Sequence, residues 1–521
     1  MSNLSASLVQ FSPELILVIG AAVLLTVDLV SNGREAGQNA IGLGTILLAL
    51  VATFWLWPGG LFTADGGLFA TYVDGALVRP GAFVSDGFTH FFRMISLVST
   101  GLVWVSGVTF MRGRTAFRGE FGAFLLFCAT AMNLMAGAND LILVLVAIEF
   151  LSITSYVLTG FLRENARSNE AGLKYFLYGS ITSAAMIFGL TYLFGATGTT
   201  SLPLIADAVR SPDNLLIKDL SGVIIPALLL VLAGLGFKIA LVPFHQWAPD
   251  AYEGAPTPVT SFLSVGPKAA GMAVLLRMFF SAFDAPLLTP HWIGLIGLLA
   301  GATMILGNLA ALGQTDIKRL MAYSSIAQAG YMLVGVASFG ATTMGSLTAL
   351  GTVVLYILAY IFTNIGLFAC IIAVDHATGD SRVDAYDGLM RRAPLLAVAM
   401  VIFFLSLVGV PPLAGFIGKF AVFSAAVTTN HTTLAVLGVL TGVIAAVYYF
   451  RVVRAMFFRP APDGAAPIRI SPSASFVIWA CLAMTILIGV LPGTFVRVAR
   501  DAAAAVHAPS AEGATVDAGH E

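Results

Sequence analysis

Four ionisable side chains stand inside long apolar stretches of this sequence: Glu149, Lys238, Lys268 and Lys419. A charged side chain near the centre of a bilayer costs about 2.5–3.5 kcal/mol on insertion scales. The four together would cost about 10–14 kcal/mol, which is comparable to the whole stability of a typical domain. A purely structural role does not account for such a penalty. We therefore interpret these residues as functional side chains that face one another and internal water.

Lysine in such a position suits proton transfer. The usual pKa of a lysine side chain is about 10.4; loss of water or a nearby cation lowers it, whereas a nearby carboxylate raises it again. A lysine that moves between these surroundings binds and releases a proton near pH 7, and the separation of a Glu–Lys pair would act as the switch. We therefore predict that the buried lysines carry protons.

Two further residues have open interpretations. Lys174 lies a few residues inside its apolar stretch, where its stem can extend to the water interface, or it belongs to the same polar axis. His245 follows a stretch broken by proline, so a hydrogen-bonding role at a water cavity and plain core packing are both open. Structural roles are expected for Arg277 and Glu14 at the interfaces, and for Arg93 in a helix-end cluster.

Composition places this chemistry in a membrane. The chain has 521 residues, of which 58% are apolar and only 10% are charged, against about 25% charged in an ordinary soluble domain. Its net charge of −1 provides no basic surface for nucleic acid. The start of the chain lacks the basic region of a cleavable signal, so we expect residue 1 to be retained. Neither metal-ligand spacing nor a phosphate loop is present, and no bound cofactor is expected.

The elements that must position these residues are long apolar helices. A span needs about 20 apolar residues, and fourteen candidate spans follow from the runs bounded by charges, Gly and Pro. The cytoplasmic loops of membrane proteins are rich in Lys and Arg. If both termini lie outside, fifteen of the 26 Lys and Arg residues fall in inward-facing loops and five in outward-facing loops. The predicted spans are 13–30, 40–57, 87–110, 120–138, 140–162, 171–195, 221–243, 257–280, 292–312, 318–339, 344–373, 394–426, 431–458 and 473–495.

Two of these spans are predicted to be broken. Residues 394–426 would be roughly 50 Å long as one helix, against a hydrocarbon core of about 30 Å, and they contain Pro411 and Pro412. The seventh span runs into Pro243. Irregular backbone at this depth is tolerated only where protein or a water-filled cavity surrounds it.

A weak repeat relates the two halves. Residues 149–160 match residues 324–335, and five spans separate the equivalent points, so the second copy would be inverted in the membrane. We therefore predict an all-α polytopic membrane protein of about fourteen transmembrane helices, with two inverted five-helix repeats and broken helices 7 and 12. The predicted units are 1–119 (helices 1–3), 120–280 (first repeat, helices 4–8), 292–458 (second repeat, helices 9–13), 473–495 (helix 14) and 496–521 (a polar disordered tail).

Three motifs carry a resemblance to a known family. They are "FKIALVPFHQWAPDAYEGAPTPVTSFLSVGPKAAG" (237–271), "QTDIKRLMAYSSIAQAGYMLVG" (314–335) and "GVPPLAGFIGKF" (409–420). The chain resembles, over its whole length, the antiporter-like subunits of respiratory complex I. It ends soon after the last span, unlike the longer L-type chains with a lateral helix. It also carries Lys419 where M-type chains typically carry Glu.

The resemblance implies a role for each buried residue. Glu149 and Lys238 would form the pair at the cytoplasmic half channel, Lys268 the central relay, and Lys419 the link to the other half channel. Lys174 would be an accessory member of the polar axis. Quinone reduction elsewhere in the complex would drive the switch.

The resemblance also implies a setting. The complex would use FMN, iron–sulphur clusters and quinone, none of them held by this chain. The expected partners are an M-like antiporter subunit, small K/J/A-type subunits and the lipid of a bacterial inner membrane, with both termini periplasmic. The alternatives are a cation/proton antiporter of the Mrp type, whose large subunits share these motifs, and a membrane scaffold that transports nothing.

Overall fold

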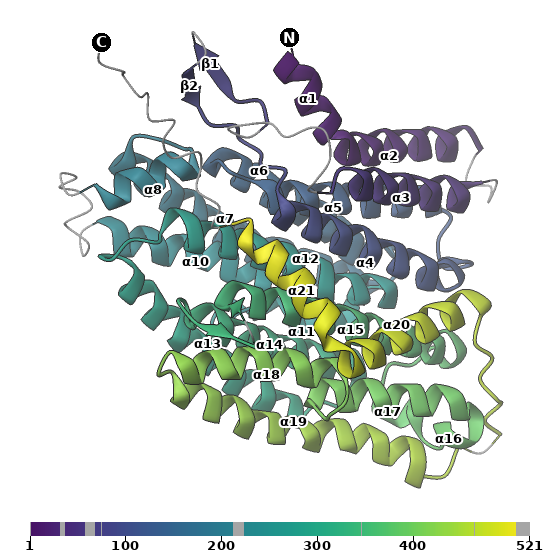
Figure 1. The fold of residues 1–521 in the computed structure, drawn as a ribbon. Helices are drawn as coiled ribbons and strands as arrows, with labels where there is room; N and C mark the ends of the chain where they lie inside the picture. The colour runs from purple at the N-terminus through teal and green to yellow at the C-terminus, as the bar shows by residue number, and fades with distance from the viewer. Residues whose placement is uncertain are drawn as a thin grey trace, which may run out of the picture.

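The chain folds into a bundle of helices that lie roughly side by side (Figure 1). The computed structural model describes residues 2–31, 37–57, 68–73, 76–211, 223–344, 346–462 and 464–506. In this part the helices dominate, which confirms the all-α prediction. Two short antiparallel hairpins interrupt them, β1 (Thr71–Val73) with β2 (Ala76–Arg79) and β3 (Thr342–Thr343) with β4 (Leu347–Thr348).

Twelve helices in the described residues are long and apolar enough to cross a membrane. Three shorter apolar helices, α10, α17 and α18, accompany them. The protein is thus polytopic, while the number fourteen and the inverted repeats remain predictions. The long helices are α2 (Ser12–Ser31), α3 (Gln38–Trp55), α4 (Gly87–Met111), α5 (Arg118–Gly137), α6 (Leu141–Thr159), α7 (Ala166–Thr197), α12 (Thr257–Arg277), α13 (Thr289–Leu312), α14 (Ile317–Ala337), α15 (Ala349–Thr378), α19 (Thr432–Phe458) and α20 (Pro472–Val490). The others are α1 (Ser2–Gln10), α8 (Leu202–Arg210), α11 (Trp247–Gly254), α16 (Leu389–Arg392), η2 (Met278–Ala282) and η3 (Val383–Tyr386).

Both predicted breaks are present. The helix α10 (Ile225–Ile239) ends where Ala240 adopts a left-handed conformation with φ 65°, and α11 begins after a turn. In the same way α17 (Pro394–Val408) ends at left-handed Gly409, with φ 99°, before α18 (Ala414–Thr428) begins. A left-handed residue stops the helical backbone and leaves carbonyl groups at the helix end without intrahelical partners. Each break therefore exposes polar backbone groups inside the bundle.

Four connections meet at one end of the bundle. Arg114 after α4, Asn165 before α7, Lys318 at the start of α14 and Ser381 after α15 line one cavity. We call this end the arginine-rich end, because the connections predicted to be cytoplasmic on their basic content converge there. Its cytoplasmic orientation stays a prediction. Arg34 and Lys218, which also entered the charge count, lie outside the described residues.

One predicted boundary is wrong. The disordered tail expected over 496–521 begins as a helix, because α21 covers Pro492–Ala504 and packs against α4 and α15. Figure 1 shows α21 crossing its neighbours obliquely. Proline at the first position and the alanines that follow favour a helix. The small side chains of Ala499, Ala502 and Ala503 are buried against the bundle. Residues 507–521 lie outside the described part.

Two buried ion pairs tie the first helices to the rest of the bundle at the end opposite the arginine-rich end. Arg93 on α4 donates through Nε and Nη2 to Glu14 on α2, both at 2.8 Å, and both side chains are fully buried. Arg277 on α12 binds Asp86 in the same two-pronged way, at 2.9 Å. The expectation that Glu14 and Arg277 reach the interface is therefore wrong. Burial alone would raise the pKa of Asp86, but the Arg277 guanidinium and the hydrogen bonds from Thr89 hold it below its usual value.

Removing one partner of the Glu14–Arg93 pair is expected to destabilise the protein. The Glu14→Gln variant leaves the Arg93 charge buried without a carboxylate, which costs about 3–5 kcal/mol. The double variant Glu14→Gln with Arg93→Met should recover much of the loss, because no uncompensated charge remains. The thermal midpoint of the detergent-solubilised protein measures both effects. Equal midpoints for wild type and Glu14→Gln would contradict this assignment.

Candidate proton-transfer site

The first predicted lysine lies at the break in the seventh span. Lys238 occupies the last turn of α10 and is 1% exposed. Its Nζ donates to Ser152 Oγ on α6 at 3.0 Å and lies 6.0 Å from the centre of the Tyr175 ring. The negative end of the α10 dipole further favours a cation there. The ammonium group is thus held by a hydroxyl rather than by a carboxylate.

Glu149 lies one helical turn from that hydroxyl. It precedes Ser152 by three residues on α6, so both side chains lie on one face of the helix. Because Lys238 binds Ser152, a carboxylate at position 149 would be within electrostatic range of the Lys238 ammonium group. Yet among the described residues it forms no ion pair with Lys238, and its Oε1 is buried without a hydrogen-bond partner. The structure therefore places Glu149 and Lys238 near each other without a direct ion pair between them.

Lys268 lies on a helix that is buried along its whole length. Its Nζ donates to the hydroxyl of Ser325 on α14 at 2.6 Å and also to the Ser325 carbonyl. The Ser325 hydroxyl is joined as well by the Tyr360 hydroxyl at 2.9 Å and by the Tyr252 hydroxyl at 3.4 Å. Ser325 therefore connects Lys268 with α15 and α11.

Lys419 lies at the second break. Its Nζ donates to the carbonyl oxygens of Leu407 at 2.9 Å and Val408 at 3.0 Å, which end α17. It also lies 4.4 Å from the centre of the Tyr331 ring. The end of the half-helix α17 therefore faces this lysine. Because the carbonyl end carries partial negative charge, it stabilises the ammonium form without a carboxylate.

The two residues with open interpretations lie apart from these contacts. Lys174 is 40% exposed and forms ion pairs with Glu170 at 2.7 Å and Asp250 at 2.9 Å. Asp250 also binds Arg319 at 2.6 Å, so Lys174 belongs to a half-exposed network at the arginine-rich end. His245 lies half-buried in the turn between α10 and α11, where its Nδ1 has no partner among the described residues.

Polar residues that carry no signal in the sequence lie between Lys268 and Lys419. On α14, Ser325 binds Lys268, and Gln328 one turn later donates to the Leu407 carbonyl at 3.2 Å, which is also an acceptor for Lys419. On α15, Tyr360 donates to Ser325 and Tyr356 donates to Gln328. These four residues form two adjacent cross-links between α14 and α15. Serine, glutamine and tyrosine are common in apolar helices, so spacing alone gave no signal.

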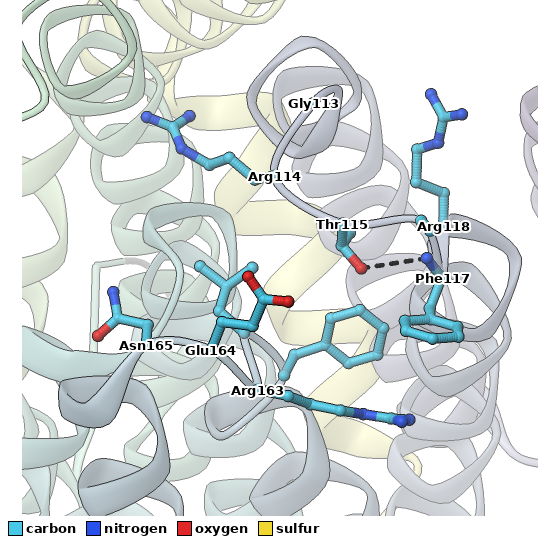
Figure 2. A pocket seen from close by; sticks show the side chains of 11 residues that line it. Gly113, Arg114, Thr115, Phe117, Arg118, Arg163, Glu164 and Asn165 are labelled. Atoms are coloured by element: carbon cyan, nitrogen blue, oxygen red, sulfur yellow. Dashed lines mark hydrogen bonds between the residues drawn. The ribbon is translucent and has the colours of Figure 1, made fainter.

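One cavity lies away from the lysines. It measures about 770 Å³ and is lined by residues 113–118 and 161–165 at the arginine-rich end. The guanidinium groups of Arg114, Arg118 and Arg163 point in different directions around it (Figure 2). They do not converge on one point, as the donors of an anion site would. None of the predicted site residues lines this cavity.

The family follows from comparison with known proteins. Residues 138–445 match the family described as NADH:quinone oxidoreductase/Mrp antiporter, transmembrane. The chain belongs to this family. The matched region contains Glu149, Lys238, Lys268, Lys419 and most of their partners. It also contains both broken helices.

Relatives within the NADH:quinone oxidoreductase/Mrp antiporter family are similar over nearly the whole chain. NADH-quinone oxidoreductase subunit N 2 of Symbiobacterium thermophilum is 40% identical, covering 85% of this chain and 86% of that protein. NADH-quinone oxidoreductase subunit N of Myxococcus xanthus is 38% identical, covering 95% and 97%.

Solved structures agree with this assignment. A chain of respiratory complex I from Thermus thermophilus with bound aureothin has a TM-score of 0.74 at 31% identity, covering 94% of this chain and 99% of that one. A chain of the Mrp complex from Dietzia sp. has a TM-score of 0.81 at 21% identity, covering 96% and 97%. The second likeness supports the shared fold alone.

Proposed function

We propose that the chain is the N-type membrane subunit of a bacterial NADH:quinone oxidoreductase and that it translocates protons along Glu149, Lys238, Lys268 and Lys419. Identity of 36–40% to subunit N proteins supports the first part. The observation that carries the second part is the set of contacts made by the buried lysines. Each lysine Nζ donates a hydrogen bond to a hydroxyl or carbonyl oxygen. Such a neutral acceptor can position the lysine without requiring it to stay protonated, as a carboxylate would.

The contacts support a path that links the three lysines through the bundle. The stem of Lys238 packs against α12 at Gly271, three residues from Lys268, since a Cβ at Gly271 would lie 3.5 Å from the Lys238 side chain. From Lys268 the path continues through Ser325 and Gln328 to the Leu407 carbonyl beside Lys419. These contacts support the assignment of the three lysines to one polar axis that crosses both broken helices.

The contacts of Lys238 suggest the switch. In the observed arrangement its ammonium binds Ser152, and the Glu149 carboxylate lies one turn away. A small side-chain movement would exchange the hydroxyl for the carboxylate and so strengthen the hold on the proton. Movement back toward Ser152 would weaken that hold and pass the proton toward Lys268.

Other subunits would supply the driving force. Oxidation of NADH through FMN and iron–sulphur clusters, and reduction of quinone, would take place outside this chain. An M-like antiporter subunit and small K/J/A-type subunits would transmit the change within the bacterial inner membrane, with both termini of this chain periplasmic. Lys174 and His245 would be accessory residues near the arginine-rich end.

A cation/proton antiporter subunit of the Mrp type is the second candidate, because the fold matches an Mrp chain with a TM-score of 0.81. Purification from native membranes separates the two. Co-purification with flavin and iron–sulphur subunits supports the first function, and an assembly without redox subunits supports the second.

The central lysine provides the direct test of the proton path. We expect Lys268→Ala to reduce proton pumping by about 10²-fold or more, since a positioned proton-transfer group contributes that much. Pumping is measured in inverted membrane vesicles against NADH oxidation, with assembly checked on native gels. Arg459→Ala is a suitable control, because Arg459 is 43% exposed and pairs only at the surface. Normal pumping by an assembled Lys268→Ala complex would show that the lysine carries no protons.

A further inference from the structure

The face of the Tyr331 ring on α14 lies beside the ammonium group of Lys419. The lysine Nζ is 4.4 Å from the ring centre, and the tyrosine is 0% exposed. An aromatic face attracts a cation within about 6 Å of its centre, and the attraction is strongest where water is excluded. The hydrogen bonds of Nζ in the described residues go to the carbonyl oxygens of Leu407 and Val408. The ring and two carbonyl oxygens, rather than a carboxylate, therefore stabilise the ammonium form.

Two helices bind the Tyr331 hydroxyl. Asn308 on α13 donates to it at 3.0 Å, and it donates to the hydroxyl of Thr441 on α19 at 3.3 Å. Thr441 donates its own proton to the carbonyl of Leu437 at 2.8 Å, so its oxygen is left to accept. Because the Tyr331 hydroxyl is occupied both as donor and as acceptor, the residue presents its ring face to Lys419.

Close packing fixes the position of the lysine relative to the ring. A Cβ at Gly409, where φ is 99°, would lie 3.1 Å from Lys419 Cδ, and a Cβ at Gly442 on α19 would lie 3.9 Å from Nζ. Phe423, one turn after Lys419 on α18, packs against the Tyr331 ring in an edge-to-face arrangement, with 6.0 Å between the ring centres. The end of α17, together with α18 and α19, thus encloses the ammonium group beside the ring.

The helices packed against α18 bring no second charge to this position in the described part of the chain. Neither α17 nor α20 contains Asp, Glu, Lys, Arg or His. On α14, α15 and α19 the residues that carry charge or an imidazole lie at the helix ends toward the arginine-rich end, nine or more residues from the positions that contact Lys419 or its neighbours. They are Lys318, Arg319, Asp375, His376, Arg451 and Arg454. The other titratable groups on these helices and α20 are phenols and thiols, which are neutral near pH 7: Tyr323, Tyr331, Tyr356, Tyr360, Tyr448, Tyr449, Cys370 and Cys481.

The same face of α14 also contacts the central lysine. Ser325, Gln328 and Tyr331 follow one another at intervals of three residues, which makes them neighbours on the helix surface. Ser325 binds Lys268, and Gln328 donates to a carbonyl that also binds Lys419. A movement of α14 relative to α17 would therefore change the contacts of both lysines together.

We propose that Tyr331 is a positioning residue for proton transfer at Lys419: its ring face favours the ammonium form and holds it against the end of α17. Lys419 keeps its proton while the ring and the carbonyl oxygens flank Nζ, and it binds the proton less tightly once α14 and α17 move apart. This inference rests on the proposed function. It assigns to an uncharged aromatic side chain the role that the Glu149 carboxylate has beside Lys238 in the proposed switch.

A series of fluorinated rings tests the contribution of the ring face. Phenylalanine and its mono-, di- and trifluorinated analogues are placed at position 331 by nonsense suppression, and proton pumping by the assembled complex in inverted vesicles is measured against pH. Fluorine withdraws electrons from the ring face and changes the shape of the ring little, so each fluorine weakens the attraction for the ammonium group.

Tyr331→Phe should keep the wild-type pH profile, because it keeps the ring face. With each added fluorine the alkaline limb of the profile should move to lower pH, by about one unit for the trifluorinated ring, since Lys419 then loses its proton more easily. A profile that does not follow the number of fluorine atoms overturns the inference.

Two leucine variants separate the ring face from the loss of a buried tyrosine. Tyr331→Leu and Tyr448→Leu each remove a buried tyrosine that binds Asn308, but in the described residues the Tyr448 ring lies over no lysine. Both variants should lower the thermal midpoint, whereas only Tyr331→Leu should move the alkaline limb, by about one pH unit. An equal displacement in both variants would show that Tyr331 acts only through packing.

The Lys419→Ala variant in the same series distinguishes this inference from the proposed function. If Lys419→Ala blocks pumping while the fluorinated rings leave the pH profile unchanged, the proposed function stands and the role of Tyr331 is refuted. Normal pumping by an assembled Lys419→Ala complex would contradict both.

Discussion

Replacing Lys238 with alanine is expected to abolish pumping coupled to NADH oxidation, with a loss of about 10²-fold or more. The reason is its place at the end of α10, where it is the only lysine within reach of both Ser152 and the Glu149 charge in the described residues. Lys238→Arg should not restore pumping, because a guanidinium does not release its proton. The measurement is the proton-to-electron ratio of assembled complex in inverted vesicles.

Variants of Glu149 and Ser152 separate the contributions that these two residues make to the role of Lys238. Glu149→Gln should depress turnover strongly, and Glu149→Asp more mildly, because the carboxylate is kept on a shorter stem. Ser152→Ala removes the hydroxyl that holds Lys238 and should slow turnover about tenfold, the equivalent of one hydrogen bond. An assembled Lys238→Ala complex that pumps fully would refute the relay, whatever the partner variants do.

The Lys419→Ala variant is expected to block translocation while the complex still assembles. Removal of a buried charge lowers the insertion cost by about 2.5–3.5 kcal/mol, so the membrane fold should tolerate it. The pumping loss should again reach about 10²-fold, because no other cation binds the Leu407 and Val408 carbonyls in the described residues. Pumping, NADH oxidation and native gels are measured together.

The charge-reversed variant Lys419→Glu gives the sharper outcome. Beside two carbonyl oxygens the carboxyl group is favoured in its protonated form, which can donate a hydrogen bond and still carry a proton. We therefore expect partial pumping from Lys419→Glu and none from Lys419→Ala. An unchanged proton-to-electron ratio in assembled Lys419→Ala would show that the lysine is structural.

The architecture could be predicted where a signal was local. Charge-free apolar runs predicted membrane helices, and Pro411 and Pro412 together with an overlong run predicted the second break. The helix α21 was missed because an alanine-rich, partly charged tail lacks a continuous apolar run; its stability comes from packing on α4 and α15. The buried pair of Glu14 and Arg93 was missed because the two residues are 79 positions apart.

By itself the sequence determined that Glu149, Lys238, Lys268 and Lys419 are the costly charges, since an ionisable group in an apolar run is visible from its neighbours along the chain. Only the tertiary structure decided what each charge touches. A serine in a membrane helix can bond its own backbone, as Ser106 does, or a distant side chain, as Ser152 and Ser325 do. Which of these occurs depends on the neighbouring helix, and helix packing is set by contacts between residues far apart in the sequence.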